Sequence, residues 1–118
     1  MEKYNKRSIG SQKEELAANY LLQRGYEIIQ MNFFCRSGEI DIVAKDNDYL
    51  VFIEVKYRLD SRLGLPQEAV NYYKIKSIVK AARYYLYKHG MSEETKCRFD
   101  VVAIEGNDIS IIQDAFYS

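Results

Sequence analysis

The sequence predicts a single α/β domain, residues 1–118, whose elements follow the order α-β-β-β-α-β-β. Two stretches carry apolar residues at helical spacing, and five shorter stretches are rich in β-branched and aromatic residues with a period of two. A chain of 118 residues is also long enough to bury one hydrophobic core. Because the second helix separates three strands from two, we expect it to return the chain so that residues 99–104 lie parallel to a strand already in the sheet.

The first helix is expected over residues 11–24, followed by a strand over residues 26–34. Gly25 stands between them, where a C-cap glycine belongs. Glu14 borders the apolar stripe of this helix, but it is also close to the helix start, where the helix dipole favours a carboxylate for purely structural reasons. The stripe consists of Leu16, Ala17, Tyr20 and Leu21.

The next two strands, residues 39–45 and 49–57, are expected to form a hairpin around the turn-prone sequence Asp46-Asn47-Asp48. If Asn47 and Asp48 are the loop residues, the numbers of paired residues sum to 95. One side of the hairpin is then wholly apolar and belongs to the core, and its pairs are Ile40 with Val55, Ile42 with Ile53, and Ala44 with Val51.

On the other side of this hairpin Asp41 would face Glu54, and Glu39 would face Lys56. Directly opposed residues have Cβ atoms about 4.5–5.5 Å apart, and two carboxylates at roughly 5 Å repel by about 3 kcal/mol at an effective dielectric constant of about 20. A divalent cation between them would remove the repulsion, because hard cations bind carboxylate oxygens. A loop one residue longer or shorter would instead place Asp41 and Glu54 on opposite faces.

The pattern of Asp41 followed by Glu54-x-Lys56 suits phosphodiester hydrolysis. Asp41 and Glu54 would hold Mg²⁺, the Val55 carbonyl would be a further ligand, and Glu14 would complete the outer shell. The metal would polarise a phosphoryl oxygen and acidify a bound water, while Lys56 would orient that water or offset charge in the transition state. The competing interpretation is that Lys56 forms a cross-strand ion pair with Glu39 and that Asp41 points to water.

The sequence after residue 58 predicts a loop, a long helix and two strands. Residues 59–67 are polar, contain the only proline and are expected to form a loop beside the end of the hairpin. Residues 98–105 and 108–113 are expected to be the last two strands. An amphipathic helix is expected from residue 67 or 68 to residue 88, with an apolar stripe of Ala69, Val70, Tyr73, Ile78, Ala81, Ala82, Tyr85 and Leu86.

The net charge is zero, which by itself counts against simple nucleic-acid binding. The charges are unevenly distributed, however, since residues 56–88 hold eight basic and two acidic residues, whereas residues 93–118 hold two basic and six acidic ones. Either the basic middle contacts nucleic acid or its charges simply solvate a helix face. The candidate nucleic-acid contacts are Arg58, Arg62 and Lys74. Nucleotide bases could also stack on Tyr72, Tyr84 and Tyr87, unless these tyrosines pack in the core.

Other classes of protein are disfavoured by composition. One histidine and two cysteines leave no realistic zinc site, and no histidine stands beside a candidate nucleophile. Cys35 and Cys97 are expected to be reduced thiols in a cytoplasmic protein, and His89 is expected to cap a helix end. No apolar run approaches 18 residues, so no membrane span is expected, and the first residues lack the apolar core of a secretion signal.

Short motifs are spread over nearly the whole chain, between residues 10 and 116. They are Gly10 and Glu14 before A-x-x-Y-L (Ala17, Tyr20 and Leu21), N-x-x-x-R-x-G-E-I-D (residues 32–41), F-x-E-V-K-x-R (52–58), G-x-P-x-E-A-V (64–70) followed by Lys74, and R-F-D (98–100). Together they resemble the YraN family, small bacterial endonuclease-like proteins of the PD-(D/E)xK restriction-endonuclease-like superfamily. Lys13 replaces the usual glycine before Glu14, but the carboxylate itself is kept.

The resemblance implies a restriction-endonuclease-like fold, with a central mixed β-sheet flanked by helices, and metal-dependent endonuclease activity on DNA. Glu14, Asp41, Glu54 and Lys56 would be the catalytic set, with Mg²⁺ or Mn²⁺ as cofactor. Archaeal Holliday-junction resolvases are similar mainly in the hairpin, which suggests branched or structured DNA as the substrate. Many superfamily relatives act as homodimers, so a homodimer stays open. Two other readings also stay open: a nucleic-acid-binding protein with little or no catalysis, and a protein–protein adaptor that kept the fold.

Overall fold

The computed structural model describes residues 6–58 and 71–116, and its elements follow the predicted order. The helices are α1 (Lys6–Gln23) and α2 (Tyr72–Lys88), and the strands are β1 (Glu27–Cys35), β2 (Gly38–Asp46), β3 (Tyr49–Arg58), β4 (Cys97–Glu105) and β5 (Asp108–Ile112).

Two of the predicted helix boundaries differ from the structure. Helix α1 begins at Lys6, earlier than predicted. Helix α2 begins at Tyr72, because the Asn71 side chain caps its first turn by accepting a hydrogen bond from the Lys74 amide at 2.9 Å. The predicted loop over residues 59–67 and the predicted first turn of the second helix lie outside the described residues.

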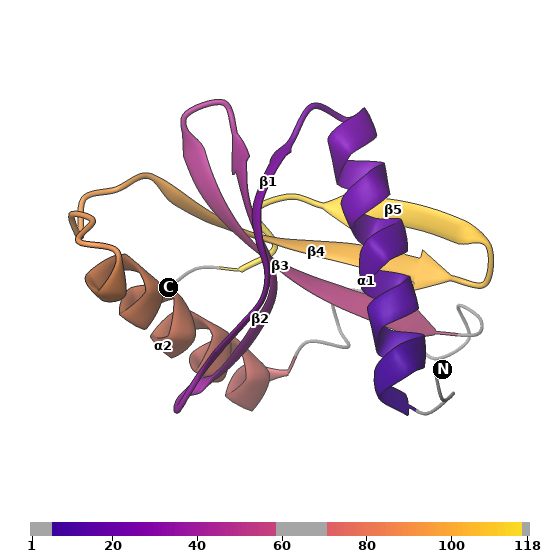
Figure 1. Ribbon diagram of the computed structural model, residues 1–118, viewed down its shortest axis with the longest axis horizontal. Helices are drawn as coiled ribbons and strands as arrows, with labels where there is room; N and C mark the ends of the chain where they lie inside the picture. The colour runs from indigo at the N-terminus through magenta and orange to yellow at the C-terminus, as the bar shows by residue number, and fades with distance from the viewer. Residues whose placement is uncertain (1–5, 59–70, 117–118) are drawn as a thin grey trace.

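The five strands form one mixed sheet in the order β1-β2-β3-β4-β5 (Figure 1). Strands β3 and β4 pair in parallel, with Val55 beside Val102, whereas the other neighbouring pairs are antiparallel. Helix α2 lies between β3 and β4 in the chain, so the predicted crossover and the parallel pairing are both confirmed. A mixed sheet of this connectivity with two flanking helices is consistent with a restriction-endonuclease-like fold.

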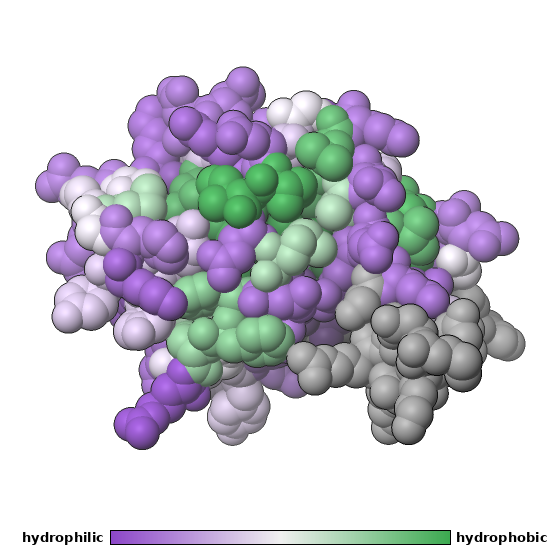
Figure 2. Space-filling model, in the orientation of Figure 1, coloured by the Kyte–Doolittle hydropathy of each residue, from purple (hydrophilic) through white to green (hydrophobic). Residues whose placement is uncertain are grey.

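The two helices cover opposite faces of the sheet, giving three layers (Figure 1). Helix α1 packs on one face through Ala17 and Leu21, and α2 packs on the other through residues that include Ile78, Ala81 and Tyr85. In the space-filling view, apolar residues gather in patches across the middle of the molecule, and hydrophilic residues occupy most of its rim (Figure 2). Within the described residues, no helix is long and apolar enough to cross a membrane.

The β2–β3 hairpin has the predicted register over its first half. Asp46 pairs with Tyr49 and Ile42 pairs with Ile53, as expected for a two-residue loop. The backbone pairing then ends at Ile42 and Ile53, because the two strands separate beyond this point. The ladder therefore does not include the predicted pairs Ile40–Val55, Asp41–Glu54 and Glu39–Lys56.

The prediction that Ile40 and Ile42 share a face of the sheet is wrong. Ile40 packs in the core under α2, and Ile42 packs in the core under α1. The neighbouring strand changes in the same way, since Phe33 and Met31, which pair with Ile40 and Ile42, pack on different faces. Asn32 lies between them with a φ of 56°, a left-handed conformation that is uncommon for a residue in a strand. This local distortion breaks the alternation on which the prediction depended.

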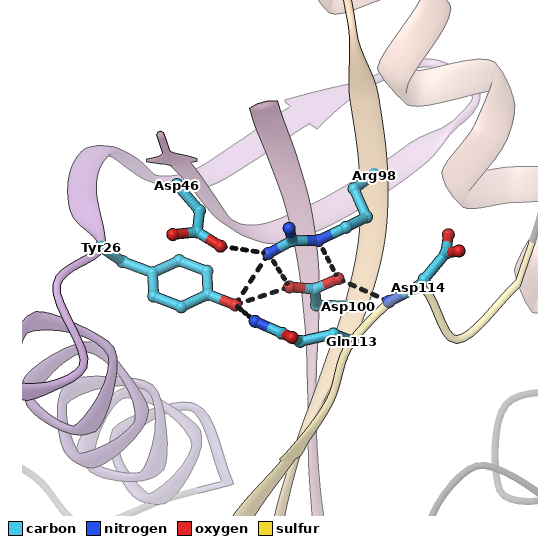
Figure 3. A network of polar contacts seen from close by, with 6 residues as sticks. All are labelled: Tyr26, Asp46, Arg98, Asp100, Gln113 and Asp114. Carbon is cyan, nitrogen blue, oxygen red and sulfur yellow. Dashed lines mark hydrogen bonds and ion pairs between the residues drawn. The ribbon is translucent and has the colours of Figure 1, made fainter. Parts of the chain in front are cut away.

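A buried polar network around Asp100 closes the end of the sheet that holds Asp46 (Figure 3). Arg98 donates hydrogen bonds to both Asp100 oxygens, at 3.0 and 2.9 Å, and to Asp46 at 2.8 Å. Tyr26 donates to Asp100 at 2.9 Å, and burial raises the pKa of Tyr26 to about 12. The Asp114 amide donates at 2.9 Å to Asp100 Oδ1, the oxygen that Tyr26 does not contact. Because its charge is fully partnered, Asp100 can remain buried and join β2, β4, the residue before β1 and the chain after β5.

Candidate active site

Asp41 lies just beyond the last backbone pair of β2 and β3, and its side chain takes the place of a backbone partner. Its Oδ2 atom accepts a hydrogen bond from the Val55 amide at 2.8 Å. Burial raises the pKa of the Asp41 carboxyl, and this hydrogen bond partly offsets the rise. Since the N–H and C=O of one residue in an extended strand point the same way, the Val55 carbonyl also faces β2. The Asp41 carboxylate thus meets the Val55 backbone on the side of β3 that faces β2.

Glu54 is buried next to Asp41, with only 5% of its surface exposed. Its Oε2 atom lies 3.7 Å from the Nζ atoms of both Lys56 and Lys74. Its Oε1 atom is buried and has no hydrogen-bond partner among the described residues. Burial and the charge of Asp41 raise the pKa of Glu54 to about 7, although both lysines act in the opposite direction. An unpartnered buried oxygen of this kind costs about 1–3 kcal/mol, so this atom favours a ligand.

Glu14 and Glu39 bring two more carboxylates to Asp41. One oxygen of each of these three residues lies within 4.8 Å of the others. Burial and the neighbouring Asp41 charge raise the pKa values of both Glu14 and Glu39, and a hydrogen bond with Asn32 opposes the rise at Glu14. Glu14 comes from α1, so the helix on one face of the sheet reaches the same point as β2. Four carboxylates thus converge with two lysines.

The role predicted for Glu39 is wrong in one respect. Glu39 was expected to form a cross-strand pair with Lys56, but the backbone pairing stops before it, and Lys56 lies beside Glu54 instead. Glu39 joins the acidic cluster, and Asn32 contacts Glu14, although neither was expected at the site. The sequence did hold a signal for Glu39, because it stands two residues before Asp41 in the same strand.

Lys74 reaches Glu54 because the first half of α2 is docked on the β1–β2 turn. Ser77 donates a hydrogen bond from Oγ to the Ser37 carbonyl at 2.7 Å. Gly38 lies so close to Ser77 that any side chain at position 38 would collide with the Ser77 hydroxyl, and its φ of 155° is also one that residues with side chains rarely adopt. Lys74, predicted as a nucleic-acid contact, is therefore held at the carboxylate cluster itself.

The other predicted contacts lie away from this cluster or outside the described residues. Arg58 forms an ion pair with Glu105 of β4 at 3.4 Å. Arg62 falls in residues 59–70, outside the described part of the chain. His89 caps the C-terminus of α2, with its amide and ring both bonded to the Tyr85 carbonyl, so its predicted structural role is confirmed.

The donor set of the cluster fits a hard divalent cation. Glu14, Glu39 and Asp41 bring three carboxylates close enough to share one ion, and Glu54 lies beside Asp41; all supply oxygen ligands, which Mg²⁺ and Mn²⁺ prefer over nitrogen or sulfur. Lys56 and Lys74 balance only part of the negative charge of the four carboxylates. Glu54 is not one of the three residues whose oxygens lie within 4.8 Å of one another, but it neighbours Asp41 and its Oε1 atom has no hydrogen-bond partner among the described residues. The residues present therefore fit a Mg²⁺ or Mn²⁺ site.

Comparison with known proteins gives consistent matches over most of the chain. The model of the family described as "Uncharacterised protein family UPF0102" matches residues 13–104. A UPF0102 protein of Lachnoclostridium phytofermentans is 49% identical over 112 residues, which cover 95% of each chain. One from Clostridium kluyveri is 45% identical over 122 aligned positions and 98% of each chain, and one from Thermodesulfovibrio yellowstonii is 44% identical over 109 residues, 92% of this chain and 96% of the relative. None of these names states an activity.

Proposed function

Since this chain belongs to the uncharacterised protein family UPF0102, whose name states no activity, we propose its function from the site: it is a metal-dependent nuclease that hydrolyses phosphodiester bonds in DNA. The observation that carries the proposal is the buried pair Asp41 and Glu54, which lies beside two lysines and offers an unpartnered oxygen. A stable fold has no need of such a cluster, because buried carboxylates whose charge is only partly balanced are costly.

Asp41, Glu54 and the Val55 carbonyl would hold the cation, with Glu14 and Glu39 completing its surroundings. Bound there, Mg²⁺ or Mn²⁺ would polarise the phosphoryl oxygen and lower the pKa of a coordinated water. Support comes from the all-oxygen donor set and from the hydrogen bond at 2.8 Å that orients Asp41.

The two lysines would act on the substrate. Lys56 Nζ and Lys74 Nζ each lie 3.7 Å from Glu54 Oε2, so both ammonium groups stand at the edge of the carboxylate cluster. There they would attract a DNA phosphate and offset the negative charge that develops on it during hydrolysis. Lys56 follows Glu54 by two residues on the same strand, which suits it to orient the attacking water.

Cleavage of labelled DNA in Mg²⁺ or Mn²⁺ tests this proposal. We expect cleavage of a four-way junction, with linear duplex and single strand as comparisons, and we expect Asp41→Asn or Lys56→Ala to lower the rate by at least 100-fold. Arg24→Gln, on an exposed residue of the turn after α1, serves as the control and is expected to leave the rate unchanged. Cleavage that persists in both site variants would contradict the proposal.

A second candidate is a nucleic-acid-binding protein with little or no catalysis. It is favoured by helix α2, which carries five basic residues and no acidic residue between Tyr72 and Lys88. Salt-dependent binding of DNA without cleavage in either metal would select it over the nuclease.

A further inference from the structure

The solvent-facing side of α2 combines aromatic and basic side chains. Tyr73 and Tyr87 are each 80% exposed, and Tyr84 is 44% exposed. At 100° per residue, six exposed residues of this helix fall within an arc of about 100°. We call them the α2 stripe: Tyr73, Lys76, Lys80, Arg83, Tyr84 and Tyr87.

The fold does not need these tyrosines for packing. The opposite side of α2 is already filled by buried residues, namely Ile78, Val79, Ala81, Ala82 and Tyr85. Tyr73 was predicted to belong to that apolar side, and the structure places it in solvent instead, because its position on the helix lies about 140° from that of Ile78. Several large aromatic side chains therefore remain in water on one helix, next to cations and away from any acidic residue of the same helix.

We propose that the α2 stripe binds a single-stranded segment of the nucleic acid that is cut at the carboxylate cluster, an inference that rests on the proposed function. Single-stranded nucleic acid is recognised by cations that follow its phosphates and by aromatic rings on which its bases stack. The stripe supplies both along one side of the helix, with three cations between Tyr73 at one end and the pair Tyr84 and Tyr87 at the other. A partner of this chemistry must be negatively charged and must carry flat apolar faces, and bases on a phosphate backbone meet both conditions.

The stripe begins at the end of α2 that lies nearer the candidate active site, although its own side chains point away from that site. Tyr73 directly precedes Lys74, whose ammonium group lies 3.7 Å from Glu54. From Tyr73 to Tyr87 the helix extends for about 21 Å, at 1.5 Å per residue. In Figure 1, α2 lies at one side of the molecule, and the stripe residues on it are exposed among the described residues. A strand lying along the stripe would thus have one end beside the carboxylates.

The aromatic groups are partly held in place before any ligand arrives. The rings of Tyr84 and Tyr87 lie 6.3 Å apart, and the ring of Tyr84 also lies 6.2 Å from that of Phe33 in β1. Arg83 and Tyr87 border a recess of about 650 Å³ between α2 and β4. The end of the stripe at Tyr87 is therefore concave and can partly enclose a bound group. Groups that are already ordered lose less conformational entropy on binding.

A lipid surface fits these residues less well than nucleic acid. A basic amphipathic helix binds a membrane by inserting its apolar face, and the apolar face of α2 is buried against the sheet. The exposed side offers tyrosine hydroxyls and cations, which suit a polyanion in water.

Binding of fluorescein-labelled (dT)₂₀ in EDTA, followed by fluorescence anisotropy, tests the stripe without any cleavage. We expect the single strand to bind more tightly than a blunt duplex of equal length. Tyr84→Leu with Tyr87→Leu is expected to weaken binding at least tenfold, because leucine keeps apolar bulk but loses the stacking face. Tyr84→Phe with Tyr87→Phe keeps the rings and should bind within twofold of the wild type. Lys76→Gln with Lys80→Gln should reduce the slope of log K against log salt by about 1.4.

The controls are Tyr49→Leu, on an exposed tyrosine at the β2–β3 turn, and Arg24→Gln, in the turn after α1, and both are expected to bind as the wild type does. Thermal unfolding by circular dichroism verifies that each variant is folded.

Unchanged binding by the double leucine variant, equal affinity for blunt duplex, or binding to phosphatidylserine vesicles in place of (dT)₂₀ would overturn the proposal. Stripe-dependent binding without cleavage in Mg²⁺ would contradict only the nuclease, whereas cleavage sensitive to Asp41→Asn with stripe-independent binding would contradict only the stripe.

Discussion

The Asp41 carboxylate is hydrogen-bonded at 2.8 Å to the backbone amide of Val55, at the point where β2 and β3 stop pairing through their backbones. A regular hairpin would satisfy this amide with a carbonyl from the opposite strand. Here the side chain does so, which holds the separated strands together and leaves an acidic group between them. The same contact therefore serves the fold and presents a ligand, so the two roles can be separated by the choice of substitution.

Asp41→Ala and Asp41→Asn both remove the charge, but only asparagine keeps an acceptor for the Val55 amide. We expect Asp41→Ala to be less stable than Asp41→Asn by about 1–3 kcal/mol, the usual cost of leaving a buried donor without a partner. Urea unfolding of both variants in EDTA measures the difference. Equal free energies of unfolding would mean that the amide finds another partner and that the strands do not depend on this side chain.

The pKa of Glu54, raised to about 7, makes the metal-free protein less stable as the pH rises. A Glu54 carboxyl with the ordinary pKa of 4.5 in the unfolded chain binds its proton more tightly in the folded protein. Its stabilising contribution is thus fully present below about pH 4.5 and is lost as the pH passes about 7. We expect the free energy of unfolding of the wild type, relative to that of Glu54→Gln, to fall by on the order of 1–3 kcal/mol between pH 4.5 and 8 in EDTA. A difference that stays constant over this range would be the contrary result.

A divalent cation should reverse that loss, since it would bind the folded protein through carboxylates that the unfolded chain does not bring together. At a Mn²⁺ concentration of 100 times Kd, the expected stabilisation is about 2.7 kcal/mol. Glu54→Gln and Asp41→Asn should abolish it, whereas Glu27→Gln, on an exposed residue of β1, should not. Thermal unfolding with and without Mn²⁺ provides the measurement. An equal effect of Mn²⁺ on all four proteins would indicate binding elsewhere.

The sequence was sufficient to predict the parts of this site that depend on local spacing. The two-residue loop at Asn47 and Asp48 determines the hairpin register, and the period of two places Lys56 on the same side of β3 as Glu54. The apolar stripe of α1 likewise pointed to Glu14, because a helix that packs through Leu21 turns its border residues toward the sheet.

Features that depend on neighbouring strands could not be predicted in this way. The face of Ile40 depends on the left-handed conformation of Asn32, which belongs to another strand and has no signature in the spacing of β2. The approach of Lys74 to Glu54 depends on the contact between Gly38 and Ser77, two residues that only the complete fold brings together. Glu39 was assigned the wrong partner because the alternation of a regular strand was extended past the point where pairing stops.

The Arg98 network provides a final prediction, which concerns stability alone. Arg98 contacts Asp46 and the fully buried Asp100, so Arg98→Met would leave a buried carboxylate without its cation. We expect a loss of about 3–5 kcal/mol in the free energy of unfolding, the usual result of breaking a buried pair from one side. The control is Lys96→Gln, because Lys96 pairs with Asp48 in solvent at 3.8 Å and its loss should cost less than about 1 kcal/mol. Urea unfolding at pH 7 compares the two variants, and similar small losses would show that Asp100 tolerates burial without Arg98.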